Sequence, residues 1–151
     1  MPEYLITPAT EEERDWAAGL MACTEPWISL KASYESCYQS CHDNEYLLFI
    51  AHASGTACGM MLLQRRGVAS SPYLKSIAVQ DSMRGQGTGS ALLNFAENYF
   101  RPVSRHFFLC VSSFNIAAIA FYQRHGYSQV GEFRDYIIEG ASEILMHKRL
   151  K

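Results

Sequence analysis

The sequence predicts a mixed α/β domain built on one central sheet. Three observations favour this fold class. Strand-like apolar runs alternate with segments of helical periodicity along the 151 residues. Two apolar runs flank Ser54 and Gly55 in the pattern of a β-hairpin. A glycine-rich turn, RGQGTG, separates a run of strand length from an amphipathic helix.

The N-terminal half contains a strand, two helices and a hairpin. Their expected ranges are residues 4–7, 11–23, 33–41, 45–53 and 56–65. Thr10 and Glu13 form a capping-box pattern, in which each side chain bonds the backbone N–H of the other residue. This pair marks the start of the first helix. Pro26 separates the first helix from the second, weaker one.

The C-terminal half alternates strands and helices. We expect strands at residues 73–80, 105–112, 127–133 and 143–148, and helices at 88–100 and 115–125. Pro102 lies just beyond the first of these helices, Asn115 can cap the second, and Gly126 suits the position after its end. No repeat or linker interrupts the pattern, so we expect a single domain over residues 1–151.

Composition excludes several classes of protein. Hydrophobic residues make up 48% and charged residues 19%, which is typical of a folded chain and not of a disordered one. The net charge of -2 gives no basic excess, so we expect no nucleic-acid partner. Apolar runs such as residues 46–51 fall far short of the roughly 20 residues that span a bilayer, and the acidic N-terminus is unlike a signal peptide. We expect no membrane association.

The five cysteines are an odd set without paired spacing, which favours a reducing cytoplasm over a disulfide framework. Cys37 and Cys41, at positions i and i+4, share a helix face next to His42, but no CxxC motif or second pair completes a tetrahedral site, so we expect no metal. We expect the cysteines to act as small core side chains. Whether Cys37, Cys41 or Cys110 has another role stays open.

The glycine-rich turn is the strongest chemical signal in the sequence. Glycines let a ligand approach the backbone closely, and the helix N-terminus offers free N–H groups, so such a turn suits a phosphate or pyrophosphate. Two common phosphate loops fail a residue count: no Gly-Lys-Ser or Gly-Lys-Thr occurs, and Ser90 or Leu92 stands where a Rossmann motif needs its third glycine. A tight connection without any ligand remains an alternative.

Two blocks of sequence resemble the GNAT superfamily of N-acetyltransferases. Arg84-x-x-Gly87-x-Gly89, between YLKSIAV and SALLNFAE, is similar to the family's acetyl-CoA pyrophosphate loop. LCVSSFNIAAIAFYQRHGY, residues 109–127, is similar to its later strand and Asn-capped helix. The two blocks occur in the family's order. The resemblance implies a GNAT-like α/β domain with a central mixed, mostly antiparallel, twisted sheet flanked by helices.

The resemblance also assigns the coenzyme contacts. The diphosphate of acetyl-CoA, the expected co-substrate, would rest on backbone amides of Arg84, Gly85, Gln86, Gly87, Thr88 and Gly89. The pantetheine arm would pair like an added strand with the backbone of Ile77, Ala78 and Val79. Asn115 would lie near the pantetheine, with helix capping as its alternative duty.

Tyr122 is the candidate catalytic residue, because the matching tyrosine of many family members acts on the leaving thiolate. A phenol with a pKa of about 10 can protonate or stabilise a thiolate whose pKa is about 8.5. The alternative is that Tyr122 packs in the core beside Phe121.

The sequence does not identify a general base. An ammonium group with a pKa near 10 must lose a proton before it attacks. The strand at residues 73–79 contains no carboxylate, and Cys110 stands where the ribosomal-protein alanine acetyltransferases carry a Glu. We expect the remaining candidates to be solvated surface groups and assign none of them. These are His125, Glu132, Asp135, Glu139 and Glu143.

The segments around residues 27–41 and 134–143 are least like the family and are expected to bind the acceptor. Five aromatic residues could form a wall for an amine, with Glu35 attracting its charge, although ordinary packing is the alternative. They are Trp27, Tyr34, Tyr38, Tyr73 and Tyr136.

The sequence as a whole predicts an acetyl-CoA-dependent N-acetyltransferase in which a bound amine attacks the thioester directly in a ternary complex. The acceptor class is a small-molecule amine, a peptide N-terminus or a lysine. A non-catalytic acyl-CoA-binding sensor is the alternative. Exposed edges of such sheets often pair, which suggests a homodimer.

Overall fold

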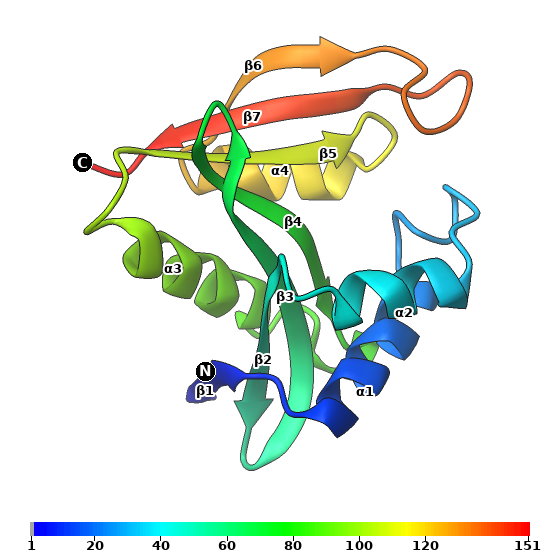
Figure 1. Cartoon of the computed structure of the whole chain (residues 1–151), viewed down its shortest axis with the longest axis vertical. Helices are drawn as coiled ribbons and strands as arrows, with labels where there is room; N and C mark the ends of the chain where they lie inside the picture. The colour runs from blue at the N-terminus through cyan, green and yellow to red at the C-terminus, as the bar shows by residue number, and fades with distance from the viewer. Residues whose placement is uncertain (1) are drawn as a thin grey trace.

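The computed structural model describes residues 2–151 as a seven-stranded sheet with helices on both faces (Figure 1). The strands are β1 (Tyr4–Pro8), β2 (Leu47–Ala53), β3 (Thr56–Val68), β4 (Ser71–Val79), β5 (His106–Ser112), β6 (Ser128–Phe133) and β7 (Glu143–Arg149). The helices are α1 (Glu11–Ala22), α2 (Tyr34–His42), α3 (Thr88–Phe100) and α4 (Ile116–Arg124), with a short 3-10 turn η1 (Asp81–Met83).

The strand order is β1-β2-β3-β4-β5-β7-β6, and the β4–β5 pair alone is parallel within the described chain. This confirms the predicted mixed, mostly antiparallel sheet. The capping box at Thr10 and Glu13 is present, and Ser33 and Asn115 cap α2 and α4 through their side chains. The hairpin is longer than predicted: β3 continues through the exposed Arg65 and Arg66 to Val68, where a tight turn leads into β4.

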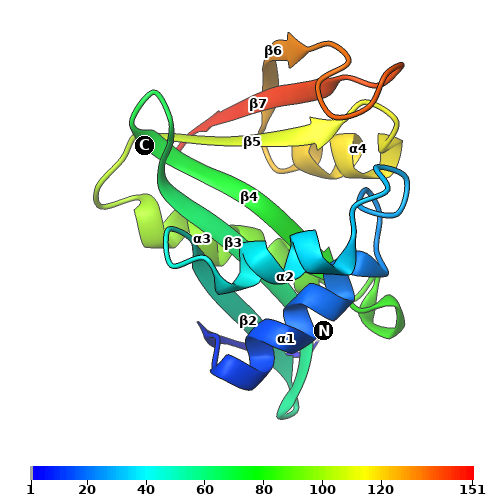
Figure 2. The same cartoon turned by 45° about the vertical axis from the view of Figure 1, so that its right-hand side comes forward.

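The sheet opens between its two parallel strands. Tyr73 pairs with Phe108 and Leu74 pairs with Leu109, after which β4 and β5 separate (Figures 1 and 2). At the same place β4 contains a bulge, because Leu62 faces Ser76 while Leu63 faces Leu74. Residues 76–79 of β4 therefore pair with β3 on one side and have an open backbone edge on the other.

Two apolar cores lie on opposite faces of the sheet. One contains Leu92, Phe100 and Phe107 beneath α3 and α4, and the other contains Met21 and Ile50 beneath α1 and α2. Cys37, Cys41 and Cys58 are buried, which confirms their prediction as core side chains, but Cys23 at the end of α1 is exposed and the prediction is wrong for it. Burial raises the pKa of the Cys41 thiol to about 12.

A buried carboxylate ties α3 to the second half of the sheet. Glu97 is 3% exposed and accepts a hydrogen bond from the Tyr127 hydroxyl at 2.8 Å and one from Lys148 Nζ at 2.9 Å. Both carboxylate oxygens are thereby satisfied, as a buried charge requires. The network holds α3, whose N-terminus follows the glycine-rich turn, in a fixed position on β7.

Within residues 2–151 no helix is long and apolar enough to cross a membrane. The same residues contain no group of three His, Cys, Asp or Glu side chains that could hold a metal ion.

Candidate active site

The glycine-rich turn presents a row of free backbone donors. Gly85 and Gly87 adopt positive φ values of 75° and 87°, which turn the chain sharply into α3. No described residue accepts a hydrogen bond from the N–H groups of residues 85–90, and no side chain caps α3. These N–H groups lie at the positive end of the helix dipole, so the turn fits an anionic phosphate group.

Tyr4 of β1 holds the turn in place. Its hydroxyl donates to the Gln86 carbonyl oxygen at 2.8 Å and accepts a hydrogen bond from Thr88 Oγ1, also at 2.8 Å. The Thr88 side chain is buried and packs toward Gly59 on β3. Thr88 therefore has its N–H, and not its hydroxyl, available to a ligand. Nothing in the sequence around Tyr4 indicated this contact.

The open edge of β4 leads away from the glycine-rich turn. The Gln80 N–H donates to the Cys58 carbonyl oxygen at 2.8 Å. This bond determines which backbone groups of β4 point toward β3. Because antiparallel bonding alternates, the backbone groups of Ile77 and Val79 point to the open edge and those of Ala78 point to β3. The Ala78 side chain is buried beneath α1 and α2.

Tyr122 lies on α4 in the core beneath α3, and 6% of its surface is exposed. Within residues 2–151 no hydrogen bond involves its hydroxyl. Every fully buried side-chain oxygen or nitrogen of these residues has a hydrogen-bond partner, so the Tyr122 hydroxyl is not fully buried. The hydroxyl tip therefore contacts solvent and is free to donate. Burial raises the pKa of Tyr122, so the phenol stays protonated at neutral pH.

Asn115 caps α4, with its Oδ1 accepting from the Ala118 N–H at 3.3 Å. The capping role is confirmed, and a pantetheine contact stays a prediction.

Both ring nitrogens of His125 contact other groups of the protein: its Nδ1 lies 2.8 Å from the Phe121 carbonyl oxygen and its Nε2 lies 3.0 Å from Ser90 Oγ. Since the carbonyl oxygen must accept, Nδ1 donates to it, and the His125 ring links α4 to α3.

Glu143 differs from its sequence prediction. Expected on the surface, it is 9% exposed at the start of β7, where its Oε2 accepts a hydrogen bond from Ser112 Oγ at 2.6 Å. The antiparallel register of β5 and β7 places these two residues opposite each other. Burial raises the pKa of the Glu143 carboxyl, and the Ser112 hydrogen bond opposes that rise.

Tyr73 and Cys110 lie beside Glu143 at the opening of the sheet. Burial is the main cause of the raised pKa of Tyr73 and of the Cys110 thiol, and the charge of Glu143 raises the pKa of both groups further. Cys110 is half-buried, so it borders the opening between β4 and β5 instead of filling the core. Glu132, Asp135 and Glu139 are exposed, as predicted.

The predicted aromatic wall separates into smaller groups. Tyr136, on the loop before β7, affects the pKa of Tyr73 and so lies near it. The ring centroids of Tyr34 and Tyr38 lie 6.1 Å apart on the exposed side of α2. Trp27 packs against the core beneath α1 and α2. The loop between α1 and α2 and the loop between β6 and β7 lie on the same side of the molecule (Figures 1 and 2).

Residues 10–127 match the model of the acetyltransferase (GNAT) family. The chain belongs to this family. It is 30% identical over 123 residues to an uncharacterized N-acetyltransferase of Methanocaldococcus jannaschii, a match that covers 80% of this chain and 74% of the relative. GNAT relatives carry out acetyl transfer to nitrogen, and the family assignment supports an acetyl-CoA-dependent N-acetyltransferase in general terms.

Solved GNAT structures share the fold. The ribosomal-protein-S18-alanine N-acetyltransferase of Escherichia coli superimposes with a TM-score of 0.79 at 22% identity, covering 99% of this chain and 95% of that one. An aminoglycoside 6'-N-acetyltransferase solved with coenzyme A gives 0.75 at 16% identity, covering 97% of each chain. These likenesses confirm the predicted GNAT-like architecture.

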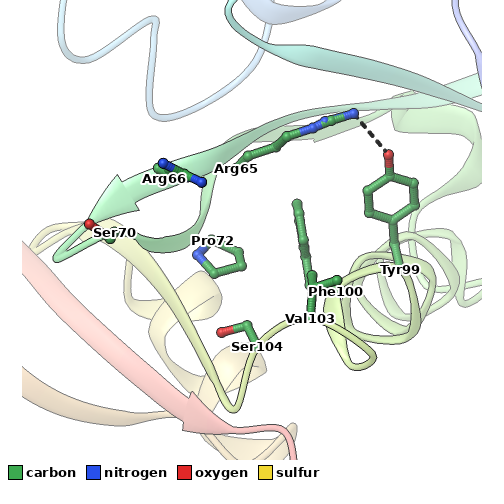
Figure 3. Close-up of a pocket in the computed structure, with 8 residues that line it drawn as sticks. All are labelled: Arg65, Arg66, Ser70, Pro72, Tyr99, Phe100, Val103 and Ser104. Atoms are coloured by element: carbon green, nitrogen blue, oxygen red, sulfur yellow. Dashed lines mark hydrogen bonds between the residues drawn. The ribbon is translucent and has the colours of Figure 1, made fainter.

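Two surface hollows complete the description of this GNAT domain. One of about 340 Å³ lies between the end of α1 and residues 80–82, directly before the glycine-rich turn. Another of about 490 Å³ lies at the far end of α3, beside the β3–β4 turn (Figure 3). It contains none of the predicted site residues, and Arg65 at its rim donates to the Tyr99 hydroxyl at 3.3 Å.

Proposed function

We propose that this chain transfers an acetyl group from acetyl-CoA to an amine by direct attack in a ternary complex. The observation that carries the proposal is the continuous path from the free N–H groups of residues 85–90 to the open edge of β4. A diphosphate on the turn and an extended amide-containing arm along β4 match these two sets of donors and acceptors.

The predicted contacts, apart from that of the Arg84 amide, then have roles. Gly85 to Gly89 bind phosphate oxygens through their N–H groups. The Arg84 N–H instead donates to the Asp81 carbonyl oxygen at 3.2 Å, and the Arg84 guanidinium pairs with the Asp81 carboxylate at 3.0 Å. Ile77 and Val79 pair with the pantetheine through their outward-facing backbone groups, whereas Ala78 contacts it at most through its side chain. Asn115, which caps α4, contacts the pantetheine in this proposal.

Tyr122 donates the proton that the leaving thiolate takes up. Support comes from its free hydroxyl, in contrast to Tyr127, whose hydroxyl is used by Glu97. The acceptor is a small-molecule amine, a peptide N-terminus or a lysine. It enters from the side of the sheet that carries α2 and the β6–β7 loop, which includes the exposed Tyr136.

The experiment that tests the proposal is thiol release from acetyl-CoA in the presence of amines, amino acids, polyamines, aminoglycosides and N-terminal peptides. Amine-dependent release supports the enzyme. The absence of a carboxylate from the strand at residues 73–79 and from position 110 keeps the acyl-CoA sensor as a second candidate. Tight acetyl-CoA binding without release across the panel would favour the sensor, and no binding would contradict both.

A further inference from the structure

We propose that Glu143 is the general base that accepts the proton of the attacking amine, an inference that rests on the proposed acetyltransferase function. Residues 73–79 of β4 contain no carboxylate, and position 110 of β5 is a cysteine. The fold supplies one instead from β7, through the pairing of Ser112 with Glu143.

The register places this carboxylate at the opening of the sheet. Paired residues share a face, so Ser112 and Glu143 lie on the same face as the neighbouring pair of Cys110 and Leu145. Cys110 and Glu143 are thus diagonal neighbours, a separation at which long side chains still reach each other. Glu143 therefore lies beside Cys110, the residue that stands where the ribosomal-protein alanine acetyltransferases carry a Glu.

Glu143 is oriented and has one free oxygen. Ser112 Oγ donates to Oε2 at 2.6 Å and holds the carboxylate in place. No described residue donates a hydrogen bond to Oε1. Every fully buried side-chain oxygen or nitrogen of the described residues has a partner, so Oε1 is accessible to solvent. An amine nitrogen entering that space meets an unused acceptor.

The acid and the base lie on opposite faces of the sheet. Tyr122 belongs to the core beneath α3 and α4, together with Val111 and Leu109 of β5. Cys110, Ser112 and Glu143 lie on the other face because side chains alternate along a strand. A thioester held in the opening between β4 and β5 would present its sulfur to one face and its carbonyl carbon to the amine arriving from the other.

The proposed step balances without another reactant. Oε1 of Glu143 accepts a proton from the ammonium nitrogen, whose freed lone pair forms the N–C bond to the thioester carbonyl carbon. The C–S bond breaks, and Tyr122 gives its proton to the leaving thiolate. Solvent takes the second proton from nitrogen, which leaves a neutral amide. Solvent then returns a proton to Tyr122 and takes the proton held by Glu143, so each turnover releases one proton overall.

The groups around Glu143 suit this duty. Tyr73 of β4 and Cys110 of β5 lie on the same face of the sheet as Glu143, and Tyr136 of the β6–β7 loop contributes to the raised pKa of Tyr73. All three are neutral when protonated, and no cation is among the causes that shift the pKa of Glu143. A carboxylate with a raised pKa is a stronger base than a solvated one.

The test compares Glu143→Gln with Glu132→Gln. Glu132 is a matched control because Ser142 Oγ donates to its Oε2 at 2.6 Å, but it is exposed and pairs with Ile144 on the opposite face of the sheet. Thiol release is measured from about pH 6 to 10, with acetyl-CoA affinity and melting temperature measured on the same proteins. Glu143→Ala is assayed with and without added formate.

We expect Glu143→Gln to lower kcat by about 100-fold or more at neutral pH, with acetyl-CoA affinity unchanged. Its rate should continue to rise with pH toward the pKa of the free amine, and formate should restore part of the activity of Glu143→Ala. An active wild type with an equally active Glu143→Gln would overturn this inference alone. A slower variant with the wild-type pH profile and no rescue by formate would do the same, since it would indicate a structural role. An inactive wild type would contradict the proposed function itself.

Discussion

The hydroxyl of Tyr4 donates a 2.8 Å hydrogen bond to the carbonyl oxygen of Gln86, which joins the first strand to the turn before α3. The same hydroxyl accepts from Thr88 Oγ1, so one side chain is bonded on both sides of Gly87. The turn is thereby held with its N–H groups directed away from the protein before any ligand binds. Such preorganisation reduces the entropy cost of binding.

Tyr4→Phe should therefore weaken acetyl-CoA binding by about fivefold, which corresponds to the roughly 1 kcal/mol of one hydrogen bond. The effect should appear in the dissociation constant, measured by calorimetry, while kcat at saturating acetyl-CoA stays close to the wild-type value. A Tyr34→Phe variant provides the control, because Tyr34 is exposed on α2. Unchanged affinity in Tyr4→Phe would show that the turn does not depend on this contact.

Tyr122→Phe should lower kcat by about 100-fold and leave the affinity for acetyl-CoA and the melting temperature nearly unchanged. The variant removes a hydroxyl that bonds to no described residue, so the packing of the ring is kept. Tyr99→Phe is the control, since the Tyr99 hydroxyl accepts from Arg65 far from the glycine-rich turn. Equal turnover of Tyr122→Phe and wild type would remove the proposed role of Tyr122.

Glu97→Ala should destabilise the fold by about 3 to 5 kcal/mol, because it leaves the Lys148 ammonium and the Tyr127 hydroxyl without their buried partner. Equilibrium denaturation measures the change. Glu11→Ala removes an ion pair with Arg14 in which the glutamate is 86% exposed, and should cost less than about 1 kcal/mol. Similar losses in the two variants would contradict the structural role of the buried network.

Glu143→Gln should make the protein more stable at neutral pH. The folded state raises the pKa of Glu143 above the ordinary 4.5, so it favours the protonated carboxyl. The stability that this preference contributes is present below pH 4.5 and is lost as the pH rises through the folded-state pKa. Glutamine does not titrate and keeps its neutral amide throughout.

The melting temperatures of Glu143→Gln and wild type should therefore be similar near pH 4 and diverge toward about pH 8, with the variant higher. All other titrating groups are common to both proteins. Parallel curves over this range would mean that Glu143 has no raised pKa in the folded state.

Features that depend on neighbouring residues were predictable from the sequence. The capping box at Thr10 and Glu13, the cap at Asn115 and the glycine-rich turn each rest on residues within one short segment, and the structure contains all three. The last residues of β3, beyond Arg65, were missed because Arg66 and Gly67 are exposed and continue the strand without an apolar pattern.

Features that depend on strand register could not be predicted. Ser112 and Glu143 meet because β5 pairs with β7, and Tyr4 reaches Gln86 across a separation of 82 residues. Local patterns contain no information about such pairings, so Glu143 was assigned to the surface as an ordinary carboxylate. The opening between β4 and β5 likewise depends on where a parallel pairing stops.

The most direct test of the account is amine-dependent turnover of acetyl-CoA by the wild-type protein, with thiol release and the mass of the acceptor followed in the same reaction. We predict release of one thiol for each acetyl group gained by an amine, together with a marked loss of acetyl-CoA binding in Gly87→Val, because a β-branched residue cannot adopt the φ of 87° found there. Acetyl-CoA that stays intact with every amine tested would contradict the account.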